Sequence, residues 1–219
     1  MEQQREKIIV FAGDSTTDAD KLSTPDLIGT GYVRLVRDSL TAFRPWEFYR
    51  VFNAGVNGHT SRDLLKRWEK DVLSKAPDTV FCMIGINDVW RRLDHTAPSE
   101  DLVSPEEYGE NLSAMAEKSG DVKDFYFMTP FFMERNPQDE MRAMTQAYAD
   151  VMRRVAQKYD RPVLDIQAEF DAYMKSRSGL SICGDRVHPA SVGALLIARR
   201  IMEGVFGCAF RFEAGRETC

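Results

Sequence analysis

The sequence predicts a three-layer α/β/α sandwich built around a five-stranded parallel β-sheet. Three observations favour this class. Short apolar runs alternate with longer segments of helical periodicity along the chain, which is typical of a parallel sheet covered by helices on both faces. The 219 residues are 43% hydrophobic, enough to fill one sizeable core. No repeat, linker or change of composition divides the chain, so we expect a single domain over residues 1–219.

Five short runs rich in apolar, β-branched and aromatic residues are the predicted strands. They are Ile8–Ala12, Phe48–Phe52, Thr79–Ile84, Phe125–Met128 and Val163–Ile166. Their length and composition fit strands that are buried on both faces.

Five segments of helical periodicity separate or follow these strands. They are Gly31–Phe43, Ser61–Leu73, Pro105–Lys118, Asp139–Lys158 and Ala190–Phe206. The last has Pro189 before it and Gly207 after it, which are start and stop signals. Within Asp139–Lys158, one helical face carries Met141, Met144, Tyr148 and Met152, which we interpret as core or subunit interface.

Charge and cysteine content exclude several function classes. The 34 acidic and 29 basic residues give a net charge of -5, which disfavours nucleic acid and anionic membranes as partners. The apolar run after the polar start is too short for a signal-peptide core or a membrane span, so we expect a cytoplasmic protein. Neither a Cys-x-x-Cys pair nor a zinc-like spacing with a histidine occurs. We therefore expect free thiols at Cys82, Cys183, Cys208 and Cys219. For the protein as a whole we expect no metal and no cofactor.

The first three predicted strands are each followed by a turn rich in Gly, Asp, Asn and Ser. These turns are Gly13–Thr16, Asn53–Gly58 and Gly85–Asp88. In open parallel sheets, sites form beyond the carboxyl ends of the strands. We therefore expect the three turns to converge on one site.

Ser15, in the first of these turns, is a candidate nucleophile, and it needs a base. Of the three histidines, His188 has an aspartate, Asp185, at a spacing that lets the carboxylate hold one imidazole nitrogen while the other accepts the serine proton. His59 and His95 lack such a partner, and we interpret both as non-catalytic. The non-catalytic alternatives are that Ser15 only forms a turn and that His188 is an ordinary surface histidine.

Donors for a developing oxyanion are available in the same turns. The backbone amide of Gly58 precedes a predicted helix start, where N–H groups collect. The side-chain amide of Asn87 and the amide of Ser15 add two more donors. We predict an oxyanion hole of Ser15, Gly58 and Asn87, with a strand-end turn as the alternative reading of Asn87 and Asp88.

These residues fall into four ordered blocks, Gly13-Asp14-Ser15, Gly58, Gly85-Ile86-Asn87-Asp88 and Asp185-x-x-His188, which resemble those of the SGNH (GDSL-type) hydrolases. The resemblance implies a flavodoxin-like sandwich, a catalytic triad of Ser15, Asp185 and His188, and the oxyanion donors named above.

Within that family the chain looks most like bacterial intracellular acetylxylan esterases, through Gly29–Val33, Gly85–Arg91 and Met128–Phe131. This resemblance implies removal of acetyl groups from carbohydrate, with acetylated xylo-oligosaccharides as the expected substrate. Two positions beside the site depart from the common pattern, Thr16 after the serine and His59 after Gly58.

Trp90 and Asp14 adjoin these blocks and are candidate substrate-binding residues, because a flat indole suits a pyranose ring. Core packing is the alternative for Trp90, and a turn role for Asp14. We also expect a homo-oligomer, because large apolar residues lie outside the strands and exposed apolar surface marks interfaces. These residues are Phe131, Phe132, Met133, Phe206, Phe210 and Phe212.

Two other functions stay open. A thioesterase or lysophospholipase would use the same triad with a hydrophobic acyl channel. A phosphate-handling or metal-binding protein could use the aspartates near the first turn, although no phosphate-binding Gly-x-x-x-x-Gly-Lys-[Ser/Thr] loop occurs.

Overall fold

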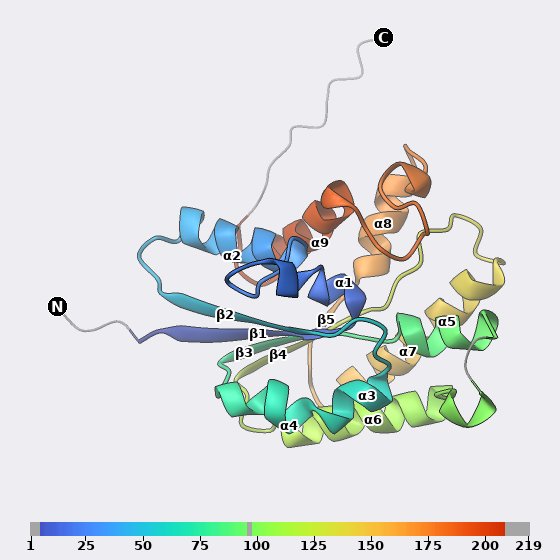
Figure 1. Cartoon of the computed structure of the whole chain (residues 1–219), viewed down its shortest axis with the longest axis horizontal. Coiled ribbons are helices and arrows are strands. Elements are labelled where there is room, and N and C mark those ends of the chain that lie inside the picture. The colour runs from blue at the N-terminus through green and yellow to red at the C-terminus, as the bar shows by residue number, and fades with distance from the viewer. Residues whose placement is uncertain (1–4, 96–97, 209–219) are drawn as a thin grey trace, which may run out of the picture.

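A computed structural model describes residues 5–95 and 98–208, and a parallel five-stranded sheet forms its centre (Figure 1). The strands lie in the order β2-β1-β3-β4-β5. Their bounds are β1 Lys7–Gly13, β2 Tyr49–Gly55, β3 Thr79–Met83, β4 Asp124–Met128 and β5 Val163–Leu164. The predicted fold class is confirmed, and each predicted strand occurs with small shifts of its ends.

Helices cover both faces of the sheet (Figure 1). One face carries α2 (Tyr32–Phe43), α8 (Ile166–Met174) and α9 (Ser191–Gly204). The other carries α3 (Ser61–Lys66), α4 (Trp68–Asp71), α6 (Pro105–Lys118) and α7 (Glu140–Lys158). Two shorter helices, α1 (Ser15–Asp18) and α5 (Ile86–Leu93), begin directly beyond the carboxyl ends of β1 and β3. Single 3-10 turns lie at Lys21–Ser23, Leu73–Lys75, Ser99–Asp101 and Gly179–Ser181.

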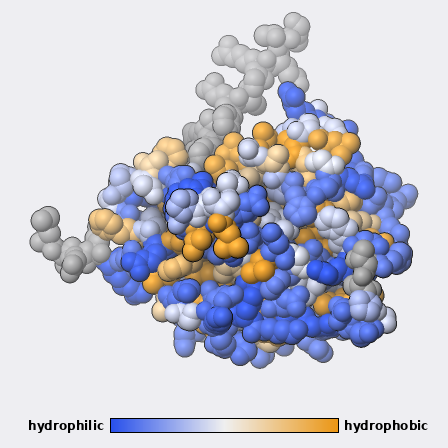
Figure 2. Space-filling view, viewed as in Figure 1, coloured by the Kyte–Doolittle hydropathy of each residue, from blue (hydrophilic) through white to orange (hydrophobic). Residues whose placement is uncertain are grey.

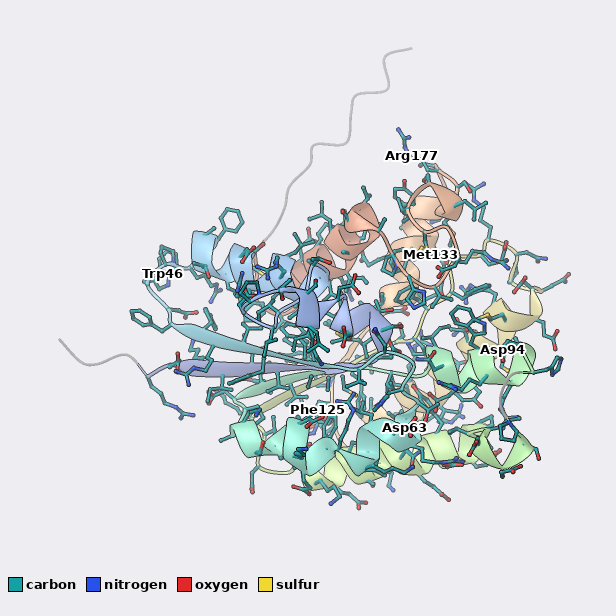
Figure 3. The ribbon with its side chains drawn as sticks, in the orientation of Figure 1. Trp46, Asp63, Asp94, Phe125, Met133 and Arg177 are labelled. Carbon is teal, nitrogen blue, oxygen red and sulfur yellow. The ribbon has the colours of Figure 1, made fainter. Side chains whose placement is uncertain are left out.

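The core divides into two layers because the side chains of each strand alternate between the faces. On β1, Ile9 and Phe11 pack toward α2 and α9, whereas Val10 and Ala12 pack toward α3, α6 and α7. Phe125 of β4 belongs to the second layer and contacts Trp68 (Figure 3). Polar residues cover most of the visible surface (Figure 2). The two buried layers hold the sheet rigid, so its carboxyl edge can position a site.

Two sequence predictions about the elements need correction, and three short helices are additions to the prediction. The helix predicted over Ser61–Leu73 breaks at Arg67, which ends α3 and begins α4. The run Val163–Ile166 gives a strand of only two residues, since Asp165 caps α8 through the amide of Ala168. The helices α1, α5 and α8 were not predicted, because each follows its strand without an intervening loop and is short.

The apolar residues used to predict an interface are mostly core. Phe131, Phe132 and Met133 are each under 5% exposed, and Phe206 packs against the first core layer. Phe210 and Phe212 lie outside the described residues. The exposure argument for an oligomer is therefore wrong for Phe131, Phe132 and Met133, since the segment after β4 is buried, and it is weakened for Phe206.

Cys82, Cys183 and Cys208 are free thiols, as predicted, and Cys219 lies outside the described residues. Within residues 5–95 and 98–208, no helix combines the length and the apolar character needed to cross a membrane. The predicted methionine face of α7 packs in the second core layer through Tyr148 and Met152, with Met141 and Met144 partly buried beside it.

Candidate active site

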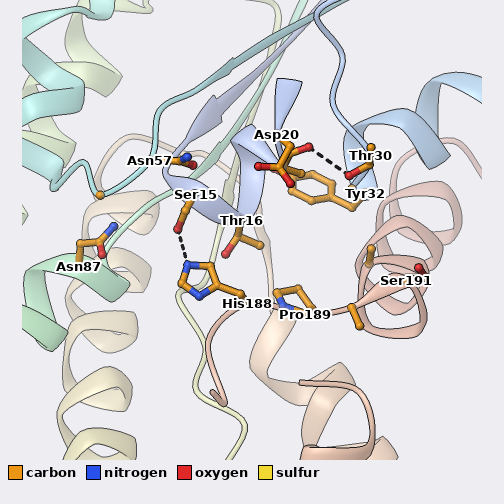
Figure 4. A pocket seen from close by; sticks show the side chains of 15 residues that line it. Ser15, Thr16, Asp20, Thr30, Tyr32, Asn57, Asn87, His188, Pro189 and Ser191 are labelled. Atoms are coloured by element: carbon orange, nitrogen blue, oxygen red, sulfur yellow. Dashed lines mark hydrogen bonds between the residues drawn. The ribbon is translucent and has the colours of Figure 1, made fainter. Parts of the chain in front are cut away.

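A cavity of about 670 Å³ opens where β1 meets its neighbours at the carboxyl edge of the sheet. The strand order reverses at β1, and ligands of open α/β sheets bind at such a point. Ser15, Gly58, Asn87 and His188 all line this cavity (Figure 4). The structure thus brings together the turns that the sequence predicted to converge.

Ser15 is the first residue of α1, and two neighbours fix its position. Asp14 caps the helix by accepting the amide of Thr16 at 3.0 Å. Gly13 has no room for a side chain, because a Cβ there would lie 2.2 Å from Thr17 Oγ1 and 2.5 Å from the carbonyl of Met83. The backbone therefore turns sharply from strand to helix and presents the Ser15 hydroxyl to the cavity.

His188, which lies just before α9, contacts Ser15 although the two residues are far apart in the sequence. Ser15 Oγ lies 2.8 Å from His188 Nε2 (Figure 4). On the other side of the ring, His188 Nδ1 lies 2.6 Å from Asp185 Oδ2. Because a carboxylate only accepts hydrogen bonds, Nδ1 carries the proton and Nε2 is left to accept from Ser15. The three residues thus form a continuous chain from hydroxyl to carboxylate.

Asp185 is held in its charged form by several donors. Its Oδ1 accepts the backbone amides of Val187 at 2.9 Å and His188 at 2.8 Å, and the Cys183 thiol at 3.2 Å. Burial opposes ionisation, but the hydrogen bond from the His188 ring and the two backbone amides outweigh it and hold the pKa of Asp185 well below its usual range. Conversely, burial and the neighbouring carboxylate raise the pKa of Cys183 to about 12, so this thiol stays protonated.

Gly58 and Asn87 line the same cavity as Ser15, Gly58 from the loop before α3 and Asn87 from the start of α5. Gly58 has a φ of +74°, in the left-handed region that favours glycine. It precedes Thr60, which forms a capping box with Asp63 at the start of α3, as the predicted helix start required. Asn87 lies in the first helical turn of α5, and not in a strand-end loop. Its Nδ2 donates to the carbonyl of His59 at 3.0 Å. One Nδ2 proton remains for another acceptor.

Asp14 does not reach the cavity. Its carboxyl is only 2% exposed and caps α1 from below. Burial raises the pKa of Asp14 to about 7, against the hydrogen bond from Thr16, and the nearby carboxylate of Asp88 raises it further. In this structure the contact of Asp14 is with the turn that carries Ser15, and Asp14 is not among the residues that line the cavity. Its role in substrate binding stays a prediction.

Asp88 had no predicted role, and the structure places it beside the start of α3, the helix that follows Gly58. Its carboxylate accepts the amide and the hydroxyl of Ser61, the first residue of α3. Burial raises the pKa of Asp88 to about 6, against these hydrogen bonds. Asp88 therefore fixes the helix that follows Gly58.

The remaining candidates lie around the cavity. Trp90 is partly exposed, and its ring centroid lies 5.9 Å from that of His188, but it packs on Ile86 and Phe132 and does not line the cavity itself. His59 also lies outside the lining, and burial together with Arg67 lowers its pKa. His95 is exposed on the loop after α5.

Sequence reasoning missed the far end of the cavity. Its lining there includes Asp20, Thr30 and Ser191 (Figure 4). The loop after α1 returns to the site because Thr30 donates twice to the carbonyl of Ala19. The segment Gly29–Val33, which carries part of the family resemblance, could have indicated this part of the cavity, because Thr30, Gly31 and Tyr32 line it. In the described part of the chain, no group of three or more His, Cys, Asp or Glu side chains could hold a metal ion.

Comparison with known proteins gives consistent matches. A model of the GDSL-like lipase/acylhydrolase family matches residues 11–195. An acetylxylan esterase from Geobacillus stearothermophilus is 38% identical over 90% of this chain and 93% of its own.

Solved structures match as well. A variant of that Geobacillus enzyme, Axe2, superposes with a TM-score of 0.90 at 35% identity, covering 97% of this chain and 100% of its own. An α/β hydrolase named LAE5, from the metagenome of Lake Arreo in Spain, gives a TM-score of 0.86 at 39% identity over 90% and 93% of the two chains. Axe2 has also been solved as catalytic mutants of a serine, a histidine and an aspartate.

Proposed function

This chain belongs to the GDSL-like lipase/acylhydrolase family, and from that premise we propose that it is a serine carboxylesterase that removes O-acetyl groups from carbohydrate. The observation that carries the proposal is the hydrogen-bonded chain from Ser15 through His188 to Asp185, with distances of 2.8 and 2.6 Å. This is the arrangement that activates a serine hydroxyl for acyl transfer.

In the first half of the reaction, Ser15 Oγ attacks the acetyl carbonyl carbon while His188 Nε2 takes the hydroxyl proton. Asp185 stabilises the imidazolium that forms. The tetrahedral intermediate collapses when its bond to the sugar oxygen breaks, and His188 gives its proton to that oxygen. The products of this half are the free sugar hydroxyl and an acetyl ester on Ser15.

In the second half, water replaces the sugar. His188 takes a proton from the water as its oxygen attacks the acetyl ester, and returns the proton to Ser15 Oγ as acetate leaves. The enzyme is restored with one water consumed and one acetate released.

The negative charge that develops on the carbonyl oxygen needs donors in both halves. We assign these to the amides of Ser15 and Gly58 and the side-chain amide of Asn87, which line the same cavity. The Ser15 amide belongs to the first residue of α1, a position whose N–H has no partner within the helix and can donate to the oxyanion.

The cavity lining favours a small acyl group and a polar alcohol. Its apolar part is formed by Ala19, Gly31, Tyr32, Pro189, Ala190 and Ala194, without an aliphatic side chain larger than proline. Hydroxyl, amide and carboxylate groups complete it, and these suit sugar hydroxyls better than a hydrocarbon chain. A thioesterase or lysophospholipase would need a longer apolar channel, so this alternative is less well supported.

The similarity to an acetylxylan esterase over most of the chain supports acetylated xylo-oligosaccharides as the substrate. A ligand of several sugars extends past the cavity, and we assign Trp90 as a contact for the sugar next to the acetyl group because its partly exposed indole lies beside His188.

Substrate class is tested by comparing acetate release from acetylated xylo-oligosaccharides with hydrolysis of p-nitrophenyl octanoate by the same preparation. We expect the kcat/KM for the oligosaccharide to exceed that for the octanoyl ester. A preference for the octanoyl ester would instead support the lipolytic alternative.

We also propose that the protein is a homo-oligomer in the cytoplasm. The support for association comes from Phe43, Trp46 and Phe48, which precede the edge strand β2 in the sequence and are 56%, 62% and 60% exposed. Figure 3 labels Trp46 among them. Light scattering over micromolar concentrations tests it, because a mass near 25 kDa would mean a monomer. Cell fractionation tests the location.

A further inference from the structure

Arg67 binds the ends of two strands and the loop that carries Gly58. Its Nη2 donates to the carbonyl of Gly13 at 2.8 Å, and its Nη1 to the carbonyl of Ala54 at 2.6 Å. Its Nε donates to His59 Nδ1 at 3.1 Å, and Nη1 also contacts Asp71 at 3.3 Å. One guanidinium therefore joins segments that are distant in sequence.

The backbone around Arg67 is arranged for these contacts. The helix predicted over Ser61–Leu73 breaks at this residue, which has φ -106° and ψ 5°. The side chain is only 12% exposed although it is charged. Burying a guanidinium is costly unless its donors are satisfied, and here four hydrogen bonds use most of its five N–H groups.

The groups that Arg67 holds are adjacent to the reacting groups. Gly13 lies two residues before Ser15, and its carbonyl also accepts the amide of Val56 in the oxyanion loop. His59 directly follows Gly58. A shift of the guanidinium would therefore change the distance between the nucleophile and the Gly58 amide.

We propose that Arg67 is a positioning residue that fixes the Ser15 turn and the Gly58 loop relative to each other, so that hydroxyl and oxyanion donor meet the same carbonyl group. The inference rests on the proposed esterase function. Arg67 itself touches neither substrate nor reacting atoms, and it acts through Gly13, Ala54 and His59.

An arginine is needed because its planar fork reaches three acceptors in different directions. A lysine ammonium at the same position is a single point of donors and cannot bind all three carbonyl and ring acceptors at once. A misplacement of about 1 Å at a catalytic site can cost about 10²-fold in rate. The loss falls on kcat, because alignment of Ser15 with the oxyanion donors matters most in the transition state.

The test uses Arg67→Ala and Arg67→Lys in the full chain, with p-nitrophenyl acetate as substrate. Active sites are counted by titration with a fluorophosphonate, so that a misfolded fraction lowers the count and not the kcat per site. We expect kcat per site to fall by about 10²-fold in Arg67→Ala and by about tenfold in Arg67→Lys, with KM within about threefold of the original.

Arg62→Ala is the matched control. Arg62 lies on α3, the helix that Arg67 ends. It binds Glu107 at 2.5 Å and carbonyls of the loop before α6, none of which adjoins Ser15 or Gly58. We expect its kcat per site to stay within about twofold of the original. A loss as large as that of Arg67→Ala would assign both effects to general loosening and overturn the proposal.

Arg67→Lys decides the matter if Arg67→Ala does not fold. A kcat per site within about threefold of the original in Arg67→Lys, or a loss that appears only in KM, overturns the positioning role. Failure of the esterase proposal gives a different result. In that case Ser15→Ala would hydrolyse p-nitrophenyl acetate as fast as the original protein, whichever residue occupies position 67.

Discussion

Ser15 Oγ and His188 Nε2 lie 2.8 Å apart although 173 positions separate them in the sequence. The serine begins α1 directly after β1, and the histidine precedes α9. The two segments meet because α9 packs on α2 and on the first core layer. The candidate chemistry thus depends on the packing of the first and last parts of the chain.

Ser15→Ala should remove nearly all esterase activity. Without the hydroxyl no acyl-enzyme forms, and loss of a triad nucleophile costs on the order of 10⁵ or more in kcat. The assay is acetate release, with circular dichroism to check the fold. Ser74→Ala is the control, because Ser74 lies in the 3-10 turn after α4 and is exposed. Near-normal activity in a folded Ser15→Ala protein would exclude Ser15 as the nucleophile.

Asn87→Ala should lower kcat by roughly 10²- to 10³-fold, as expected for removal of one oxyanion donor. KM should change much less, since the charge that Asn87 stabilises exists only in the transition state. Steady-state kinetics with p-nitrophenyl acetate measure both. If only KM rose, Asn87 would be a substrate-binding residue.

Asp14→Asn should stabilise the protein increasingly as the pH rises. Burial raises the pKa of Asp14 to about 7, from about 4 in an unfolded chain. The folded state therefore retains a proton that the unfolded state releases, and the stability from this group is complete below pH about 4 and lost as pH rises through about 7. Asparagine stays neutral and still caps α1. Thermal unfolding at several pH values measures the difference.

Asp26→Asn is the control for this effect. Hydrogen bonds from Arg34 and Arg37 hold the pKa of the exposed Asp26 below its usual range. Its ionisation therefore does not change between pH about 5 and 8 in either state, and neither should the difference in melting temperature from the original. A pH-independent difference for Asp14→Asn as well would show that Asp14 does not titrate in this range.

Trp90→Ala should reduce kcat/KM for acetylated xylo-oligosaccharide more than for p-nitrophenyl acetate. Contact between an indole and a flat partner contributes roughly 1 kcal/mol, so the expected extra loss is about fivefold. The simple ester has no sugar and serves as the internal control. Equal losses on both substrates would mean that Trp90 only packs against His188.

Much of the fold was predictable because its signals are local. The strands are short apolar runs. The start of α3 was expected at Ser61, and in the structure Thr60 and Asp63 form a capping box there. Asp185 and His188 are three residues apart, so their contact needs only one turn of chain. The oxyanion residues could be proposed from the turns that follow the strands, since parallel strands all end at one edge.

The strands, most of the helices, the side chains available for chemistry and the edge at which they gather can all be predicted from local sequence, because hydrophobic periodicity and capping act within a few residues. Three outcomes needed the folded chain. They are the burial of Asp14, the packing of Phe131–Met133 in the core, and the helix break at Arg67, which binds Gly13, Ala54 and His59. These outcomes depend on which distant groups supply hydrogen bonds and apolar cover, and those partners exist only after the sheet has assembled in the order β2-β1-β3-β4-β5.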